Sequence, residues 1–229
     1  DAAEALGTPV VSGNVSFYNQ SELGEVLPTA LIGMLGILED AGDAIGMAPN
    51  EGDMIAWVGI PFTVSRHFGL GASQFLSEVH GVESGYPEAP NAEAEKGLHE
   101  FLVAGAREGW LNAAHDISEG GAAVCLAEMG FAGGHEFEVD LSNVSLPSGA
   151  SDASRAFGEW PGVAFVSFDA GYTEQLERLA ESNGLVWGIV GKCTGSVTRI
   201  VLSPQSVLNF RLVELRELWE KSLPAMISE

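Results

Sequence analysis

The sequence predicts an α/β fold in which a mixed β-sheet is flanked by helices. Short apolar runs typical of buried strands alternate with longer segments of helical spacing, and two strand-like runs, 185–193 and 197–203, follow each other directly. Successive strands without an intervening helix favour antiparallel pairing, so part of the sheet is expected to be antiparallel. With 229 residues, 46% of them hydrophobic, the chain is long enough to bury a sizeable core.

The first part of the chain, residues 1–43, is predicted to be the end of a helix followed by two strands. Gly7 is the predicted helix stop, because glycine readily takes the left-handed conformation at a helix C-terminus. A strand is predicted over 8–18, and a second one, apolar on both faces, over 31–40. The acidic and glycine residues that follow predict a turn, and we place the domain boundary there, before 44–229.

The second part alternates strands with helices. A strand over 53–61 precedes a glycine-containing loop that leads into a helix, and further helices are predicted where apolar residues recur at helical spacing. The further helices are expected over 92–109, 122–131, 172–184 and 210–221, and the further strands over 163–168, 185–193 and 197–203.

The charge balance is strongly acidic, with 32 Asp and Glu against 10 Lys and Arg and a net charge of -22. A nucleic-acid partner is not expected, because phosphates are held by Lys and Arg. The acidic residues indicate either a solvated, highly soluble surface or carboxylates that hold a divalent cation such as Mg²⁺. Composition alone does not separate these interpretations.

Cys125 and Cys193 are the two cysteines, and their spacing predicts neither a zinc site nor a disulfide framework. A reducing cytoplasm fits this usage. The first residues show no signal-peptide pattern, and no run of apolar residues predicts a membrane span.

The segment VVSGNVSFYNQ, residues 10–20, has a row of neutral polar groups along one face of its predicted strand. The side-chain oxygen of Asn14 can ligate a hard cation, and the hydroxyl of Ser16 can bind a phosphate or sugar oxygen. Gly13 leaves the backbone open to a ligand. The alternative is a half-exposed strand whose polar face is simply solvated.

The segment AHDISEGG, residues 114–121, also carries candidate ligands. Backbone amides at a helix N-terminus attract anions, and Asp116 beside them can hold a metal that bridges phosphates. In the alternative interpretation Asp116 or Ser118 caps the following helix and the glycines permit close packing.

Three other features have weaker signals. The loop HFGLGASQF, residues 67–75, is interpreted as a turn with Ser73 as helix cap more readily than as a phosphate cradle. Glu159 is interpreted as a solvated turn residue. The remaining candidates are surface or packing histidines, namely His80, His99 and His135.

Together these stretches resemble the C-terminal part of the phosphoribosylformylglycinamidine synthase family, which belongs to the aminoimidazole ribonucleotide synthetase superfamily. The resemblance covers nearly the whole chain and lies in GTPVVSGNVSFYN, IGMLGILED, GASQFLSEVHG, the run from NAEAEKGLHEFL to AHDISEGGAAVCLAEM, and LRELWEKSLP. It implies two homologous halves, each with a small barrel-forming and a large α/β subdomain. Residues 1–43 then look like the tail strands of the second small subdomain, and 44–229 like the second, C-terminal large subdomain.

The resemblance also implies an activity. It is an ATP-dependent ligase of purine biosynthesis, which converts formylglycinamide ribonucleotide to the amidine with ATP and glutamine-derived ammonia. Phosphorylation of the amide oxygen gives an iminophosphate that ammonia displaces, and Mg²⁺ spreads the charge of the transferring phosphoryl group.

Residue roles follow by position from the resemblance. Gly13 would contact ATP, Asn14 would ligate Mg²⁺ and Ser16 would contact formylglycinamide ribonucleotide. Asp116 would be a metal ligand in an auxiliary nucleotide pocket. Catalytic residues are expected in the first half and none in this segment, and Trp160 departs from the Glu-Ser pattern that would make Glu159 a substrate contact.

The implied partners are the N-terminal half of the synthetase, a separate glutaminase subunit and a small bridging subunit. The alternative function is a non-catalytic nucleotide-binding or assembly module of the same superfamily, inactive without the N-terminal half. A sister kinase acting on another small molecule is a third interpretation.

Overall fold

The chain divides into two compact units, Asp1–Ala44 and Ile45–Glu229. The computed structural model describes residues 2–15, 18, 20–22, 24–26, 29–62, 65–195 and 197–227. We describe each unit by itself. The assignment of the two units to a small and a large subdomain stays a prediction.

The first unit has little regular structure among its described residues. It contains the helix α1 (Ala2–Ala5), a hairpin of β1 (Gln20–Ser21) and β2 (Gly24–Glu25), and the 3-10 turn η1 (Ala41–Asp43). The helix before Gly7 is confirmed, and Gly7 has a φ of +68°.

The two longer strands predicted for this unit are wrong for the residues described. Residues 8–15 and 31–38 lie outside any helix or strand, and Leu31 and Leu35 are 99% and 96% exposed. A strand is stable only when a neighbour satisfies its backbone groups and covers its apolar side chains. Among the described residues neither segment has such a neighbour, so apolar character alone does not produce a strand.

The second unit is built on a seven-stranded mixed sheet with the order β4-β6-β3-β7-β5-β8-β9. All neighbours are antiparallel except β5 and β8, which are parallel. The strands are β3 (Met54–Gly59), β4 (Ala113–Asp116), β5 (Glu136–Asp140), β6 (Val163–Phe168), β7 (Val186–Thr194), β8 (Thr198–Ser203) and β9 (Ser206–Phe210). The predicted mixed sheet flanked by helices is therefore confirmed.

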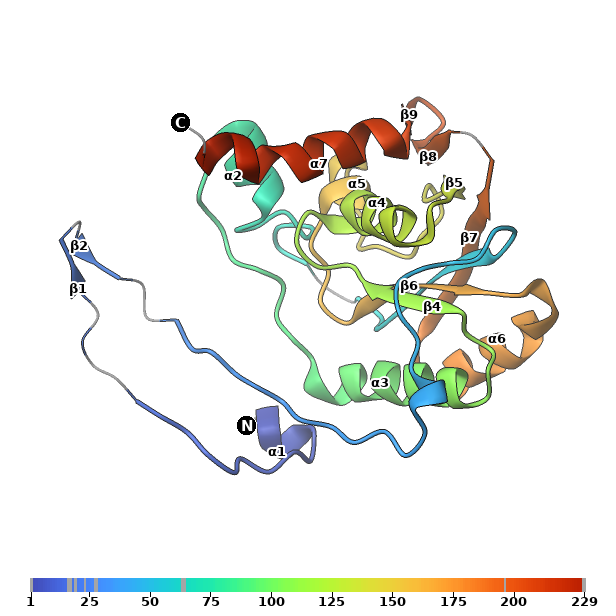
Figure 1. The fold of residues 1–229 in the computed structure, drawn as a ribbon, viewed down its shortest axis with the longest axis horizontal. Coiled ribbons are helices and arrows are strands. Elements are labelled where there is room, and N and C mark those ends of the chain that lie inside the picture. The colour runs from blue at the N-terminus through green and yellow to red at the C-terminus, as the bar shows by residue number, and fades with distance from the viewer. Residues whose placement is uncertain are drawn as a thin grey trace. The chain divides into compact units, whose positions relative to one another are not determined.

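Both faces of this sheet are covered by helices (Figure 1). Along β3, Ile55 and Trp57 enter one core while Ala56 and Val58 enter the other, because successive side chains of a strand point to opposite faces. The first core includes residues of α4 (Gly121–Gly133), α5 (Asp152–Phe157) and α7 (Leu212–Ile227). The second includes residues of α3 (Ala92–Arg107) and α6 (Thr173–Ser182).

The helices agree with the predictions except in detail. The helix α7 extends to Ile227, beyond the predicted end at 221, and the short helices α2 (Gln74–His80), η2 (Ala170–Tyr172) and α5 complete the unit. The strands β4, β5 and β9 and the helix α5 were not predicted. Among the described residues, no helix combines the length and apolar character needed to cross a bilayer.

Candidate functional site

The predicted ligand segment lies in the first unit. Gly13 and Asn14 are exposed and belong to no helix or strand, and nothing lies within 4 Å of a Cβ built on Gly13. Val11 and Val15 are also exposed, by 91% and 74%, so the expected apolar face is not buried. Ser16 lies outside the described residues. The binding roles of Gly13, Asn14 and Ser16 therefore stay predictions.

The segment AHDISEGG runs from β4 through a turn into α4, and it places one histidine between two carboxylates. His115 Nδ1 lies 3.1 Å from Oδ1 of Asp116, and His115 Nε2 lies 2.9 Å from Oε2 of Glu128. Glu128 is on α4, thirteen positions along the chain. The pairing therefore depends on how β4 and α4 pack, and no local sequence signal identifies it.

In this cluster the carboxylates favour the protonated form of His115, and His115 favours the ionised form of Asp116. The hydrogen bond to Asp116 raises the pKa of His115 most, against the lowering effect of partial burial, and the bond to Glu128 raises it further. The same hydrogen bond from His115 lowers the pKa of Asp116 to about 2. Asp116 is consequently an ionised carboxylate at neutral pH, and its side chain is 73% exposed.

Asp116 fits a cation only as one member of a larger ligand set. Within the described parts of the chain, no group of three or more His, Cys, Asp or Glu side chains is arranged to hold a metal ion. Further oxygen ligands would have to come from a bound phosphate or from another part of the protein. Its role as a metal ligand stays a prediction.

The start of α4 is held by a carboxylate from a distant loop. Gly120 N donates to Glu159 Oε1 at 3.1 Å, and Gln74 N at the start of α2 donates to the same oxygen at 2.8 Å. The N-cap residue of α4 is Gly120, which has no side-chain cap, so the prediction of Asp116 or Ser118 as cap is wrong. Glu159 is therefore a bridge between two helix N-termini, and its interpretation as a solvated turn residue is also wrong.

Gly120 and Gly121, at the start of α4, are required by close packing, as one of the interpretations predicted. Gly120 and Gly121 have φ values of +77° and +73°. A Cβ on Gly121 would lie 2.5 Å from the carbonyl carbon of Phe157 at the end of α5. A larger residue would push α4 away from α5 and from the Glu159 bridge.

The glycine loop at 67–75 serves as a helix cap. Ser73 caps α2 and accepts a hydrogen bond from Leu76 N, which confirms the predicted cap. Phe68 and Ala72 take left-handed φ values of 53° and 56°. The loop is held in this conformation by Glu88, whose Oε1 accepts from Gly69 N at 3.0 Å.

Neither cysteine is placed for nucleophilic chemistry. Cys125 and Cys193 are buried and free, and burial raises the pKa of both thiols, that of Cys193 to about 12. They contribute to packing in the first core.

The comparison with protein families decides the relationship of the second unit. Residues 50–202 match the family described as AIR synthase related protein, C-terminal domain. The chain belongs to this family. The match includes the whole segment from β3 to β8 except the last residue of β8, so it covers the His115 cluster and the Glu159 bridge.

Individual relatives extend the likeness to nearly the whole chain. It is 32% identical over 228 residues to phosphoribosylformylglycinamidine synthase subunit PurL of Moorella thermoacetica, covering 99% of this chain and 30% of the relative. It is 37% identical over 233 residues to the same subunit of an Anaeromyxobacter species, covering 99% of this chain and 29% of the relative. The chain thus spans less than a third of the length of these relatives.

Solved structures show the same fold. The Thermotoga maritima PurL complexed with FGAR aligns with a TM-score of 0.62 at 19% identity, over 75% of this chain and 29% of that one. The PurLQS structure from the same organism aligns with a TM-score of 0.58 at 17% identity, over 73% of this chain and 26% of that one. At these identities the likeness concerns the fold alone.

Proposed function

We propose that the chain is the C-terminal part of a phosphoribosylformylglycinamidine synthase synthetase subunit. The observation that carries this proposal is the identity of 32–37% to PurL subunits along 99% of the chain, which includes the segment SGNVS. The whole activity is ATP-dependent conversion of formylglycinamide ribonucleotide and ammonia to the amidine, ADP and phosphate. It takes place in the cytoplasm, and this segment supplies none of the catalytic residues.

The contribution of this chain is one wall of the binding site. Gly13 lets ATP approach the backbone, the side-chain oxygen of Asn14 ligates Mg²⁺, and the hydroxyl of Ser16 contacts formylglycinamide ribonucleotide. Bound Mg²⁺ neutralises the charge of the ATP phosphates. Asp116 helps hold a cation in an auxiliary nucleotide pocket, a role supported by its lowered pKa and by its exposed side chain.

The proposed partners supply what this segment lacks. The N-terminal half provides the other wall of the site, and ammonia comes from a separate glutaminase subunit joined through a small bridging subunit. The solved PurLQS assembly of Thermotoga maritima supports this arrangement by its name.

The decisive experiment combines the chain with a separately expressed N-terminal half of a PurL relative. We expect ammonia- and substrate-dependent ADP release in the mixture and none with either piece alone. Asn14→Ala and Ser16→Ala should each lower the restored rate about tenfold or more, as loss of about 1.4 kcal/mol of binding predicts. Tyr18→Phe, at a neighbouring exposed position without an assigned role, is the control.

Two results would contradict the proposal. Full activity of both the Asn14 and the Ser16 variants would remove the site role of SGNVS. A mixture that binds ATP without turnover would favour the alternative, a non-catalytic nucleotide-binding or assembly module.

A further inference from the structure

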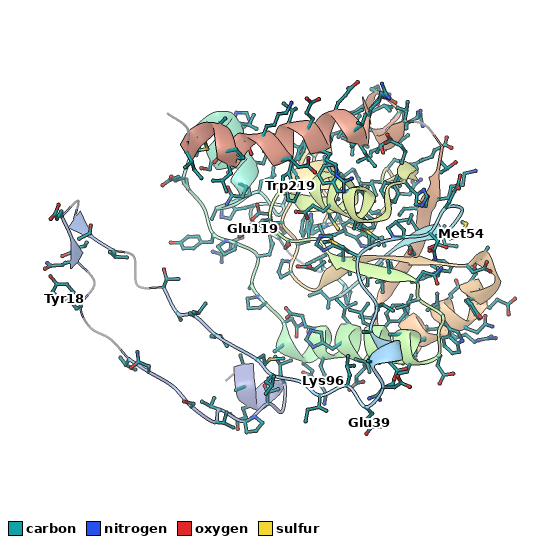
Figure 2. All side chains as sticks on the ribbon, viewed as in Figure 1. Tyr18, Glu39, Met54, Lys96, Glu119 and Trp219 are labelled. Carbon is teal, nitrogen blue, oxygen red and sulfur yellow. The ribbon has the colours of Figure 1, made fainter. Side chains whose placement is uncertain are left out.

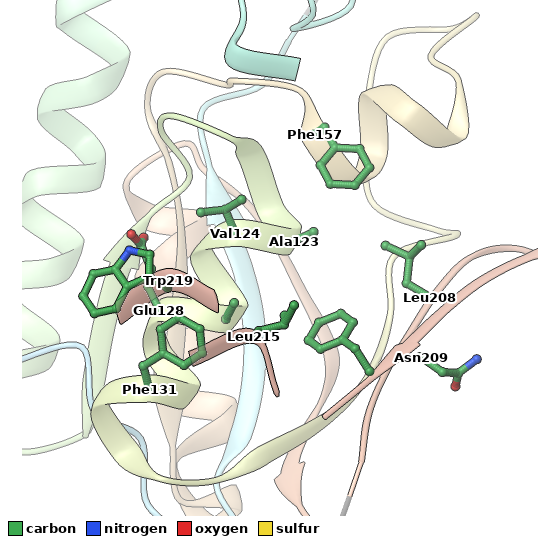
Figure 3. Close-up of a pocket in the computed structure, with 11 residues that line it drawn as sticks. Ala123, Val124, Glu128, Phe131, Phe157, Leu208, Asn209, Leu215 and Trp219 are labelled. Atoms are coloured by element: carbon green, nitrogen blue, oxygen red, sulfur yellow. The ribbon is translucent and has the colours of Figure 1, made fainter. Parts of the chain in front are cut away.

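A hollow of about 400 Å³ lies between α4, β9 and α7, and it shares Glu128 with the His115 cluster. Its size falls within the range of about 300–1,000 Å³ that is usual for small-molecule sites. Figure 3 shows Phe131, Phe157 and Trp219 around it, and Phe210 completes an aromatic wall. Trp219 projects from α7, where it is marked in Figure 2, and remains 62% exposed.

The hollow carries negative charge at one side. Glu128 is the single charged side chain among the described residues that line it, and these include no Lys or Arg. His115 Nε2 contacts Oε2 of Glu128, and the carboxylate has a second oxygen that can accept from a ligand. In Figure 3, Glu128 and Trp219 are seen at one side and Phe157 and Leu208 at the other.

The aromatic wall already accommodates a cation at its edge. The guanidinium of Arg216 lies 5.6 Å from the ring centroid of Phe131, and its charge is paired with Glu220 at 3.6 Å. Aromatic faces attract both cations and flat rings. An anion would be repelled by Glu128 and by a chain of net charge -22. A neutral apolar molecule would desolvate the second oxygen of Glu128, the one that His115 does not contact, without giving it a donor.

We propose that this hollow binds a small planar aromatic molecule that carries a positively charged amino group. The ring would lie against Phe131, Phe210 and Trp219, and the ammonium would bind the free oxygen of Glu128. The proposal is independent of the SGNVS site and of the ligase activity.

The test compares three probes that share an indole ring and differ in charge: tryptamine, neutral tryptophol and anionic indole-3-acetate. Binding to the 229-residue chain is measured by calorimetry at low salt. We expect tryptamine to bind about fivefold more tightly than tryptophol, as one partly exposed charge pair predicts, and indole-3-acetate to bind most weakly. Equal affinities, or no saturable binding of tryptamine, would overturn the proposal without any variant.

Two pairs of variants locate the site. Glu128→Gln should abolish the preference for tryptamine over tryptophol, whereas Glu217→Gln, an exposed change on α7 outside the hollow, should keep it. Trp219→Ala should weaken tryptamine binding about tenfold through loss of the aromatic contact, while its exposed neighbour variant Leu218→Ala should not. The proposal would be overturned if both Glu128→Gln and Trp219→Ala kept the affinity for tryptamine and the preference for tryptamine over tryptophol, because the binding site would then lie elsewhere.

Discussion

Asp53 offers the sharpest test of how the large unit is held together. Its side chain is buried, 6% exposed, just before β3. Its carboxylate accepts from Ser167 Oγ at 3.0 Å, Asn112 Nδ2 at 2.9 Å and Asn50 N at 2.9 Å. It therefore ties the start of β3 to β6 and to the segment before β4.

Asp53→Ala should lower the free energy of unfolding by about 3–4 kcal/mol. Leaving the fully buried hydroxyl of Ser167 without a partner costs about 2 kcal/mol, and the two part-buried donors add about 0.5–1 kcal/mol each. In urea, with a slope of about 2 kcal/mol per molar, the midpoint should fall by about 1.5–2 M.

Asp53→Asn is the matched variant. The amide oxygen can still accept from Asn50 N and Ser167 Oγ, and rotation of the Asn112 amide restores the third contact, so its cost should stay near 1 kcal/mol. Glu177→Ala removes the same charge from an exposed helix position and should be nearly neutral. A cost below 1 kcal/mol for Asp53→Ala, or equal costs for the Ala and Asn variants, would refute the reasoning.

Three further predictions concern the His115 cluster and the start of α4. Because its folded pKa is raised, His115 should stabilise the fold below its ordinary pKa of 6.5 and lose that contribution as pH rises through the folded value. Asp116 should stabilise the fold above its ordinary pKa of 3.8 and lose this contribution as pH falls toward 2. Both statements would be contradicted if the urea midpoints of His115→Gln and of the unchanged chain varied with pH in the same way. Gly121→Ala should lower the free energy of unfolding by at least about 1–2 kcal/mol more than Gly134→Ala. Both glycines have positive φ, but only a Cβ at Gly121 would clash with the backbone of α5. Equal decreases in melting temperature for the two variants would contradict this packing effect. Glu159→Ala should lower the free energy of unfolding by about 1–2 kcal/mol, and Glu159→Gln by clearly less, since glutamine keeps an acceptor. Hydrogen exchange checks this, because the first amides of α4 should lose more protection in the Ala variant than in the Gln variant.

Long apolar strands and helices of the second unit were predictable because their signals are local. The strand β6 enters both cores with alternate residues, and its continuous apolar run reflects burial on two faces. The strand β5 was missed because three of its five residues are acidic, Glu136, Glu138 and Asp140, so it lacks the apolar run. In the first unit the same local signals gave wrong strand predictions, because an apolar segment forms a strand only where a neighbouring strand pairs with it.

The sequence indicated part of the candidate site, but neither Glu128 nor the contacts within the site could be predicted from it. AHDISEGG identified Asp116 as a candidate ligand, yet the pairing of His115 with Glu128 crosses from a strand to a helix. Glu159 lies 39 residues from Gly120 and 85 from Gln74, and no spacing rule links them. Such contacts arise from the packing of distant segments, so they cannot be predicted from local sequence patterns.

By itself, the sequence VVSGNVSFYNQ raised ligand candidates, and the resemblance to the synthase family made them specific. Sequence also determined the alternating elements, the helix stop at Gly7 and the cap at Ser73, because these depend on neighbours a few positions away. Tertiary structure alone decided that β5 separates β7 from β8, that Glu159 joins two helices, and that the hollow beside Trp219 exists. The physical reason is that strand order, buried polar contacts and cavities are set by pairings between distant segments, whose energies no local pattern records.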